Sequence, residues 1–264
     1  MAKIVVLGGS FGGLTAAFEL RRLLGRSADV TVVSDDEKFV FLPSLPWLII
    51  GKRRSGDITL KVQDILQPKG IKFINEAAGR VDPDASKVYT AKGEVPYDYL
   101  VISTGPHLSF DEIMGLGPDK GHTDCTFTLN HAVTTAQKWK RLIEDPGPVI
   151  VGSSQGVSCF GPSYELAFEF DAELRKMKMR HKVPVLYLTS EPYLGHMGVG
   201  GLGNSKRFIE DEFGEREIKS LVSQAIDEVA PNEIRLKDGT KLPFKLAVIA
   251  PPFKGVPAVA SLGN

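Results

Sequence analysis

Short apolar runs alternate with longer segments of helical periodicity along this chain, and polar turns separate them. Residues 3–7 and 29–33 are β-branched runs typical of buried parallel strands, and residues 12–24 between them repeat apolar side chains at helical spacing. A strand, a helix and a second parallel strand in this order make one βαβ unit. The pattern therefore predicts that the chain opens with a doubly wound α/β sheet.

The same order returns in the second half of the chain. We expect a strand at residues 149–151, a helix at 164–177, a strand at 183–188 and a closing strand at 246–250. Two such units in one chain predict an α/β protein with two Rossmann-like domains, the fold that binds dinucleotides such as FAD and NAD(P) in the glutathione-reductase-like proteins.

The predicted domains occupy residues 1–108 and 109–250, and residues 251–264 are expected to begin a return to the first domain. Because two nested dinucleotide folds normally share the later part of a chain, we expect this sequence to be truncated before that return. In the first domain, the prolines of residues 43–47 predict an extended, rigid segment, and residues 78–95 alternate as in a small antiparallel hairpin.

Composition excludes several classes of function. The 264 residues are 42% apolar and 24% charged, and 32 basic residues balance 32 acidic ones, so no overall field recruits nucleic acid. No segment approaches the roughly 20 apolar residues of a membrane span. The N-terminal run is too short for a signal peptide, so we expect cytoplasmic synthesis. Two cysteines are too few for a disulfide scaffold, and we expect no metal site, because neither cysteine has a second cysteine at metal-ligand spacing.

The first candidate site is the run Gly8-Gly9-Ser10-Phe11-Gly12-Gly13, which follows a strand and opens a helix. Small residues there let a pyrophosphate reach the helix N-terminus, where amide groups and the dipole favour anions. Ser10 replaces the middle glycine, and a plain structural turn is the alternative. At the end of the second strand, Ser34 or Asp35 is placed to reach a ribose hydroxyl, which does not separate FAD from NAD.

A second motif favours FAD in the first domain. Residues 100–102 with Ser103-Thr104-Gly105 resemble the short motif at the exit from the first domain in flavoproteins with two dinucleotide-binding domains. A simple turn at a strand end is the alternative reading.

The second candidate site is a nucleotide loop that has lost glycines and gained a thiol. It runs Gly152-Ser153-Ser154-Gln155-Gly156-Val157-Ser158-Cys159, with Ser154 and Val157 at the second and third glycine positions. Cys159 is expected at the start of a helix, where the dipole lowers the pKa of a thiol and favours the nucleophilic thiolate. A packed cysteine in a turn that lost its cofactor is the alternative.

Three further residues are candidates for the same chemistry. Cys125 lies in a polar loop and is a candidate for disulfide or polysulfide intermediates with Cys159, against the alternative of a packed thiol. His131 and His196 are candidate proton carriers, although a lone histidine is more often part of an ordinary hydrogen-bond network. His196 falls in residues 195–203, which hold five glycines and predict a flexible loop that closely approaches a ligand or another backbone.

Four stretches together resemble the sulfide:quinone oxidoreductases, flavoproteins with two dinucleotide-binding domains. They are Phe41-Leu42-Pro43-Ser44-Leu45-Pro46-Trp47, Ser158-Cys159-Phe160-Gly161-Pro162, Ser190-Glu191-Pro192-Tyr193-Leu194-Gly195-His196 and Pro252-Phe253-Lys254-Gly255-Val256-Pro257-Ala258-Val259. The resemblance implies that FAD takes two electrons from sulfide and passes them to a membrane quinone. It also implies that Cys159 attacks or carries sulfur, that Cys125 is an accessory cysteine, and that the partner of Cys159 falls beyond Asn264.

The resemblance completes the set of residues expected to contact FAD, which is Gly8, Gly9, Ser10, Phe11, Gly12, Gly13, Ser34, Asp35, Leu42, Pro43, Ala78, Thr104 and Gly105. It further implies a peripheral membrane protein, with membrane contact made by a part beyond this sequence, and allows a homo-oligomer. The alternatives are a type II NADH:quinone oxidoreductase, a flavocytochrome c sulfide dehydrogenase flavoprotein, and a non-catalytic flavin-binding module. Because we expect this sequence to be truncated, we also expect the fragment to be inactive alone.

Overall fold

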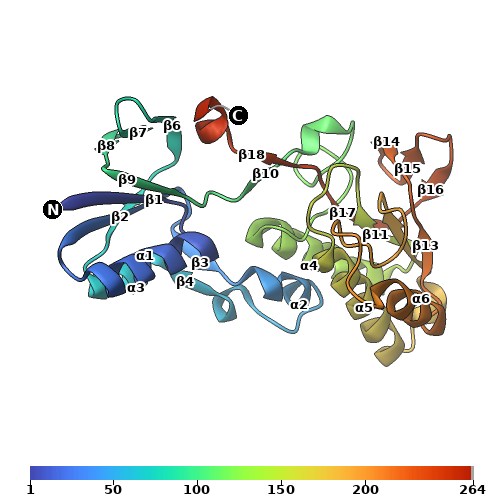
Figure 1. The fold of residues 1–264 in the computed structure, drawn as a ribbon. Coiled ribbons are helices and arrows are strands. Elements are labelled where there is room, and N and C mark those ends of the chain that lie inside the picture. The colour runs from blue at the N-terminus through green and yellow to red at the C-terminus, as the bar shows by residue number, and fades with distance from the viewer. Residues whose placement is uncertain (263–264) are drawn as a thin grey trace. The chain divides into compact units, whose positions relative to one another are not determined.

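The structure is a computed structural model that describes residues 1–262, and the chain divides into two compact units. Unit 1 comprises Met1–Phe41, Ile58–His107 and the described residues from Lys254 onward, and unit 2 comprises Leu42–Asp57 and Leu108–Phe253 (Figure 1). The chain thus enters each unit more than once. No helix within the described residues is long and apolar enough to span a bilayer.

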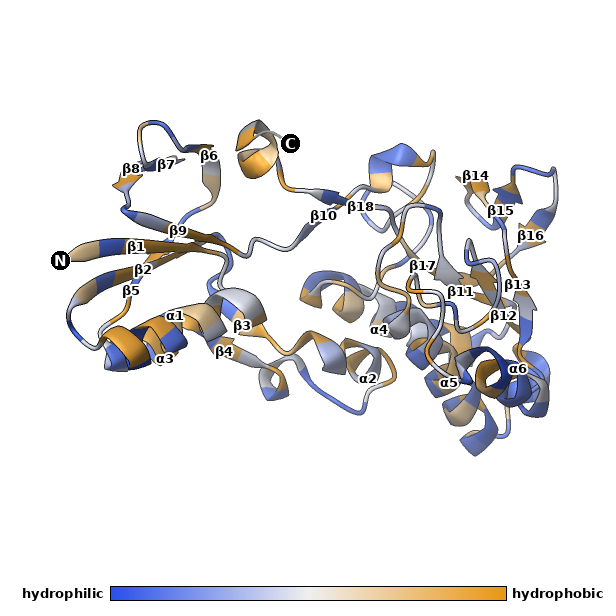
Figure 2. Ribbon diagram, in the orientation of Figure 1, coloured by the Kyte–Doolittle hydropathy of each residue, from blue (hydrophilic) through white to orange (hydrophobic). Residues whose placement is uncertain are grey.

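Unit 1 is built on a four-stranded parallel sheet in the order β5-β2-β1-β9. Its strands are β1 (Ala2–Leu7), β2 (Ala28–Ser34), β5 (Lys72–Asn75) and β9 (Tyr99–Ile102). Helix α1 (Phe11–Leu24) links β1 to β2 and buries Leu14 and Ala17 against the sheet. Figure 2 shows the expected contrast, with largely hydrophobic strands and a helix that alternates hydrophobic and hydrophilic residues.

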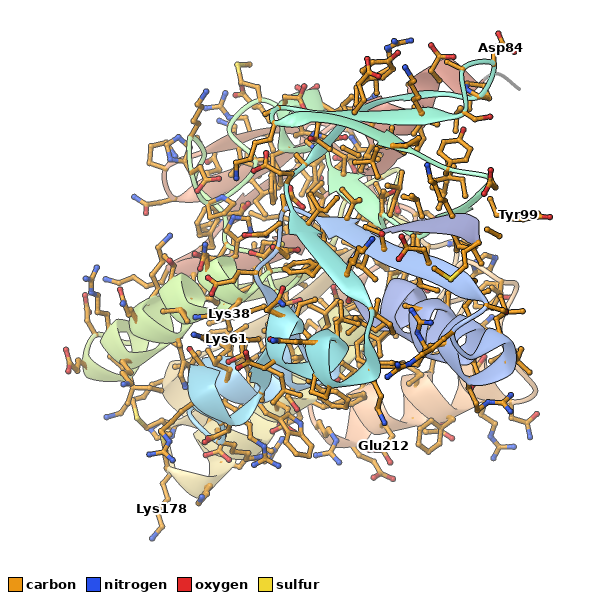
Figure 3. All side chains as sticks on the ribbon, turned by 90° about the vertical axis from the view of Figure 1, so that its left-hand side faces the viewer. Lys38, Lys61, Asp84, Tyr99, Lys178 and Glu212 are labelled. Carbon is orange, nitrogen blue, oxygen red and sulfur yellow. The ribbon has the colours of Figure 1, made fainter. Side chains whose placement is uncertain are left out.

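Short elements complete unit 1. Strands β3 (Lys38–Val40) and β4 (Thr59–Lys61) pair antiparallel, so that Lys38 and Lys61 face each other in register (Figure 3). Helix α3 (Val62–Leu66) follows β4. The expected hairpin at residues 78–95 is instead a three-stranded antiparallel sheet of β6 (Ala78–Asp82), β7 (Lys87–Thr90) and β8 (Gly93–Pro96). Strands β7 and β8 form the expected hairpin through the turn before Gly93, and a further turn at residues 83–86, where Ser86 has a positive φ of 51°, adds β6 as the third strand.

Unit 2 repeats the parallel topology in the order β13-β12-β11-β17. Its strands are β11 (Val149–Ser153), β12 (Val185–Thr189), β13 (Lys219–Leu221) and β17 (Leu246–Ala250). Its longer helices are α4 (Leu129–Glu144), α5 (Gly161–Lys176) and α6 (Ser205–Glu215). The prediction of two Rossmann-like domains is confirmed, since each first strand lies between a second strand and a later one.

An antiparallel sheet covers the parallel sheet of unit 2. It contains β14 (Ile226–Ala230), β15 (Glu233–Leu236) and β16 (Lys241–Pro243). Apolar side chains from both sheets, among them Ile150 and Ile234, form one buried cluster. The remaining strands, β10 (Pro106–Leu108) and β18 (Phe253–Gly255), pair with each other.

The expectation of an extended segment at residues 43–47 is wrong. A short 3-10 turn, Leu42–Ser44, leads into helix α2 (Leu45–Ile49), with Pro46 in its first turn. Proline is tolerated there because the first amide groups of a helix have no intrahelical partner. Leu45 and Ile49 are buried, and α2 packs on α4 and α5. This packing places residues 42–57 in unit 2, although the sequence grouped them with the first domain.

A buried carboxylate ties α5 to the loops that follow it. Asp171 is fully buried and accepts hydrogen bonds from Arg175 Nε at 2.9 Å and Arg180 Nε at 2.7 Å, and Arg216 Nη1 lies 3.6 Å away. A buried carboxylate needs such partners because removal from water penalises its charge.

Removing this charge should destabilise the chain. We expect Asp171→Asn to lower the free energy of unfolding by about 3 kcal/mol, because three guanidinium groups lose their shared partner. The exposed pair of Asp211 and Arg207 provides the control, and Asp211→Asn should change stability by less than about 1 kcal/mol. Urea unfolding followed by circular dichroism measures both, and equal effects of the two variants would contradict the assignment.

Candidate functional site

The loop between β1 and α1 is so tight that only glycine fits two of its positions. Gly8 has a φ of 106°, and its N–H donates to Val33 O at 2.8 Å. A Cβ on Gly13 would lie 1.9 Å from Gly8 O, and a Cβ on Gly8 would lie 2.3 Å from Ser103 O. These contacts bring the backbone of the loop, the first turn of α1 and the end of β9 together.

The chemistry of this loop fits the pyrophosphate of FAD. Helix α1 is 14 residues long and its first turn contains no acidic residue, so the amide groups there retain their attraction for an anion. Ser10 is the N-cap, and within the described chain its side chain makes no capping hydrogen bond. The hydroxyl of Ser10 is therefore available to a phosphate oxygen.

The expected ribose-binding residues lie beside this loop. Ser34 ends β2 and packs on Gly9, where an added Cβ would meet Ser34 Oγ at 3.1 Å. Asp35 is exposed, and its carbonyl accepts a hydrogen bond from Asn75 Nδ2 at 2.9 Å. Asp36, which sequence reasoning missed, donates its N–H to Ser34 Oγ, and burial followed by the charge of Asp35 raises its pKa. Two carboxylates thus stand at the position that dinucleotide folds use for ribose.

The turn after β9 also belongs to this site. Ser103 donates from its N–H and from Oγ to Leu7 O, at 2.9 and 2.7 Å. Thr104 and Gly105 follow directly, and Gly105 has a positive φ of 71° with open space where a Cβ would be. The contact of Ser103 with the first loop was not anticipated, because hydrogen bonds between distant strands leave no local sequence signal.

The other residues expected to contact FAD lie at different places. The exposed ring of Phe11 packs on Phe39 and Phe41, with centroids 5.0 and 5.7 Å away. Ala78 packs from β6 onto the second face of the parallel sheet. Leu42 and Pro43 are the first residues of unit 2. The roles of all these residues toward FAD stay predictions.

In unit 2 the corresponding loop is tied down by its own side chains. Ser154 is fully buried and donates from Oγ to Ala250 O at 2.9 Å. Gln155 bonds the backbone of Ile226 in both directions, as donor at 2.9 Å and acceptor at 3.0 Å. Gly152 serves sheet packing, since an added Cβ would lie 1.8 Å from Leu188 O. The side chains of Ser154 and Gln155 are thus committed within the protein.

Cys159 follows that loop and is a free, solvent-exposed thiol two residues before α5. The expectation of a lowered pKa is wrong for the isolated chain. Surrounding protein raises the pKa of Cys159 by desolvation, and a hydrogen bond from the backbone of Gly161 opposes this only in part. The placement at the N-terminal end of α5 is as predicted, but desolvation outweighs the hydrogen bond from Gly161.

Cys125 lies in a loop, as expected, but it is packed inside the protein. Its thiol is fully buried, accepts a hydrogen bond from Phe127 N–H at 3.4 Å, and has its pKa raised to about 12, mainly by burial. The cause is the backbone pairing of Asp124 with β17. Asp124 N–H donates a hydrogen bond to Ala247 O, and Asp124 O accepts one from Ile249 N–H, so the segment runs into the interior. In this setting the packed alternative fits better, and the catalytic role of Cys125 stays a prediction.

The two candidate histidines are partly buried. His131 Nε2 lies 3.7 Å from Asp119 Oδ2, and the ring of His196 packs edge-on against Tyr193. Among the described residues, Nδ1 of each ring is buried without a hydrogen-bond partner. Residues 1–262 contain no cluster of three acidic, histidine or cysteine side chains that can hold a metal ion. The proton-carrying roles of both histidines stay predictions.

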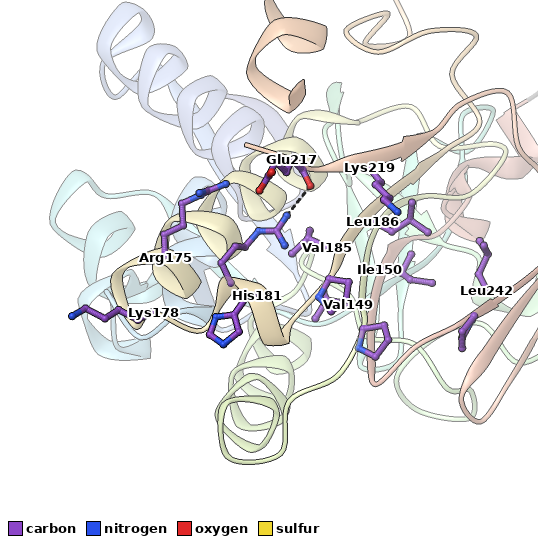
Figure 4. Close-up of a pocket in the computed structure, with 14 residues that line it drawn as sticks. Val149, Ile150, Arg175, Lys178, His181, Val185, Leu186, Glu217, Lys219 and Leu242 are labelled. Atoms are coloured by element: carbon purple, nitrogen blue, oxygen red, sulfur yellow. Dashed lines mark hydrogen bonds between the residues drawn. The ribbon is translucent and has the colours of Figure 1, made fainter. Parts of the chain in front are cut away.

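A cavity of about 900 Å³ in unit 2 is lined by residues other than those of the loop at residues 152–159. Its floor is formed at the amino ends of β11 and β12 by residues that include Val149 and Val185, and Figure 4 shows Arg175, Lys178 and His181 around it. Ligands of open α/β sheets bind at the carboxyl ends of the strands. We therefore do not assign this cavity to the reaction.

Comparison with known proteins identifies the family. A model of the pyridine nucleotide-disulphide oxidoreductase family matches residues 2–251, and the chain belongs to that family.

Two curated relatives are sulfide oxidoreductases, which confirms the resemblance found in the sequence. A sulfide-quinone reductase of Aquifex aeolicus is 42% identical over the whole chain, which covers 62% of that protein. A mitochondrial sulfide:quinone oxidoreductase of Mus musculus is 25% identical over 95% of the chain, which covers 56% of that protein. The chain thus spans about three fifths of the length of these relatives.

Solved structures agree with this assignment. The crystal structure of the sulfide:quinone oxidoreductase of Aquifex aeolicus superposes with a TM-score of 0.93 at 41% identity, covering all of this chain and 61% of that one. NDH2 of Plasmodium falciparum in complex with NADH has a TM-score of 0.75 at 17% identity, covering 98% of this chain and 56% of that one, which shows a shared fold.

The tight loop of unit 1 makes a direct prediction. Gly13→Ala should lower the free energy of unfolding by at least about 2 kcal/mol, because its Cβ would overlap Gly8 O and the backbone must shift. The matched control is Gly12→Ala, whose Cβ would meet Ser103 Cβ at 3.3 Å and whose helix propensity improves, so its effect should stay below about 1 kcal/mol. Thermal unfolding distinguishes them, and a stable Gly13→Ala variant would refute the geometry.

The two thiols should differ in reactivity. At neutral pH we expect iodoacetamide to label Cys159 in the native chain and to reach Cys125 only after unfolding, because Cys125 is buried with a pKa of about 12. Since the pKa of Cys159 is raised, its labelling rate should increase about tenfold per pH unit from pH 7 through 8. Mass spectrometry of labelled peptides gives both rates, with Cys159→Ser as the control. A plateau below pH 8 would show a lowered pKa instead.

Proposed function

We propose that the protein containing this chain oxidises sulfide to sulfane sulfur or polysulfide, with FAD in unit 1 as the electron acceptor and a membrane quinone as the next one. The observation that carries the proposal is the exposed Cys159 thiol, which follows a nucleotide loop whose Ser154 and Gln155 side chains are committed inside unit 2. The names of the relatives from Aquifex aeolicus and Mus musculus support sulfide and quinone as the substrates.

Different residues of unit 1 bind different parts of FAD. The loop from Gly8 to Gly13 and the N-terminus of α1 hold the pyrophosphate, and Asp35 and Asp36 are the candidates for the ribose hydroxyls. When bound, FAD supplies the two-electron acceptor that sulfide oxidation requires.

Cys159 supplies the sulfur acceptor. Its thiol and one hydrosulfide anion form a new S–S bond, giving a persulfide on Cys159, one proton and two electrons. Because the pKa of Cys159 is raised, the thiol is protonated at neutral pH and must release its proton as the S–S bond forms, and His196 is the candidate to carry that proton. The two electrons released would pass to bound FAD. Transfer of the outer sulfur to a further hydrosulfide or polysulfide frees Cys159 for another cycle.

The remaining parts of the proposal concern location. We propose peripheral association with a membrane, where a quinone is available. The quinone named for the relatives is a lipid-soluble substrate, which supports a membrane surface as the place of reaction.

The proposal is tested by the identity of the reductant. In anaerobic mixing of the FAD-loaded protein, sulfide should bleach the flavin absorbance within a single turnover, and NADH should leave it unchanged. Cys159→Ser should keep FAD bound and lose at least about a hundredfold in the rate of bleaching by sulfide, because the nucleophile is absent. Stopped-flow absorbance at the flavin band measures all three. Prompt bleaching by NADH would favour a type II NADH:quinone oxidoreductase and contradict the proposal.

A further inference from the structure

Unit 2 contains a buried carboxylate that the proposed reaction does not use. Glu191 is 2% exposed and accepts three hydrogen bonds. Tyr164 O–H and Thr189 O–H donate to Glu191 Oε2 at 2.7 and 2.9 Å, and Met197 N–H donates to Oε1 at 2.7 Å. Each carboxylate oxygen thus has a donor, which is the condition for burying its charge.

The partners of Glu191 extend this network to the end of the sheet and to the next loop. The Thr189 hydroxyl lies 3.0 Å from Ser153 Oγ, at the carboxyl end of β11. The Tyr164 hydroxyl accepts a hydrogen bond from Gly195 N–H at 2.9 Å. Burial, reinforced by the nearby carboxylate, raises the pKa of Tyr164, so its hydroxyl remains a donor at ordinary pH.

The two units use the same position in opposite ways. In unit 1, β2 ends at Ser34, and Asp35 and Asp36 after it are exposed to solvent. In unit 2, β12 ends at Thr189, and the acidic residue two positions later, Glu191, is turned inward. Dinucleotide folds read the ribose with an acidic side chain at this strand end. Unit 2 has that side chain but commits it to its own backbone and hydroxyls.

The backbone that Glu191 holds is strained and lies against Phe160, the residue after Cys159. Met197 has a φ of 56°, a left-handed conformation that is unfavourable for residues other than glycine. One residue later, a Cβ on Gly198 would touch the ring of Phe160 at 3.2 Å, and Phe160 directly follows Cys159. The segment is also closed on itself by hydrogen bonds such as Tyr193 O–H to Gly200 O at 2.7 Å.

We propose that Glu191 is a positioning residue that holds residues 193–203, including His196, against the carboxyl end of the unit 2 sheet beside Cys159. The same three hydrogen bonds withdraw the carboxylate from the ribose position, so that unit 2 offers no acidic group to a nicotinamide dinucleotide. Glu191 thereby acts as a specificity determinant against NADH as well as a support for the loop.

Amide hydrogen exchange tests the positioning role directly. In Tyr164→Phe, Gly195 N–H loses its acceptor and Glu191 loses a donor, and in Glu191→Gln the bond to Met197 N–H loses its charge assistance. We expect exchange at Gly195 and Met197 to become about tenfold to a hundredfold faster in these variants, the factor that follows from losing hydrogen bonds of this kind. Labelling of Cys159 should also become faster as the neighbouring segment opens.

The control is Glu210→Gln, which removes an exposed carboxylate from α6 and should leave exchange at Gly195 and Met197 unchanged. Exchange in β14 to β16 reports whether each variant is folded, and Tyr164→Phe carries the test if Glu191→Gln does not fold. Unchanged exchange at both amides in a folded variant would overturn the proposal. These results do not depend on the identity of the reductant, so they stand whether or not sulfide is the substrate.

Calorimetric titration with NADH tests the specificity role. We expect no saturable binding of NADH to unit 2 of the parent chain. Saturable binding that is weakened at least tenfold by Glu191→Gln, and not by Glu210→Gln, would show that Glu191 reads a ribose and would overturn the assignment.

Discussion

Close approach of backbone segments around the first strand of each parallel sheet is the constraint on which both units depend. In unit 1 it demands glycine at positions 8 and 13, because a Cβ on Gly13 would lie 1.9 Å from Gly8 O. In unit 2 a comparable demand falls inside the sheet, on Gly152 of β11, whose Cβ would lie 1.8 Å from Leu188 O of β12. Where the backbone packs this closely, the first turn of the helix faces the end of the sheet. Its amide groups are free there, so a ligand or a reactive side chain can lie at that end.

The two units differ in what fills that end of the sheet. In unit 1 the helix N-terminus keeps its amide groups for an anion, and Asp35 and Asp36 remain exposed. In unit 2 the side chains of Ser154, Gln155 and Glu191 bond to neighbouring backbone and hydroxyl groups. One topology thus supports a cofactor site in one unit and, on our proposal, a thiol site in the other. The polar groups decide between them, because a buried donor or acceptor already satisfied inside the protein is not available to a ligand.

Sequence reasoning was accurate where a local pattern determines the outcome and failed where distant packing does. The strands and the helices that follow β1 and β11 were predicted because apolar period and glycine position are local signals. Pro46 was misread, since α2 forms only by burying Leu45 and Ile49 against α4 and α5. The polar neighbours of Cys125 gave no sign that its thiol is packed, but pairing of Asp124 with β17 buries it. The lowered pKa expected for Cys159 neglected desolvation by the surrounding protein.

The amino-acid sequence by itself determined the α/β class, the glycine loop after the first strand, the degenerate second loop and the presence of Cys159 beside it. These depend on residue type at fixed spacing, which backbone sterics and helix geometry translate into local structure. Only the tertiary structure decided that Ser103 closes on the first loop, that Cys125 is buried and that Glu191 turns inward toward Tyr164 and Met197. Such contacts join residues far apart in the chain or depend on which way a side chain turns, so no local pattern records them.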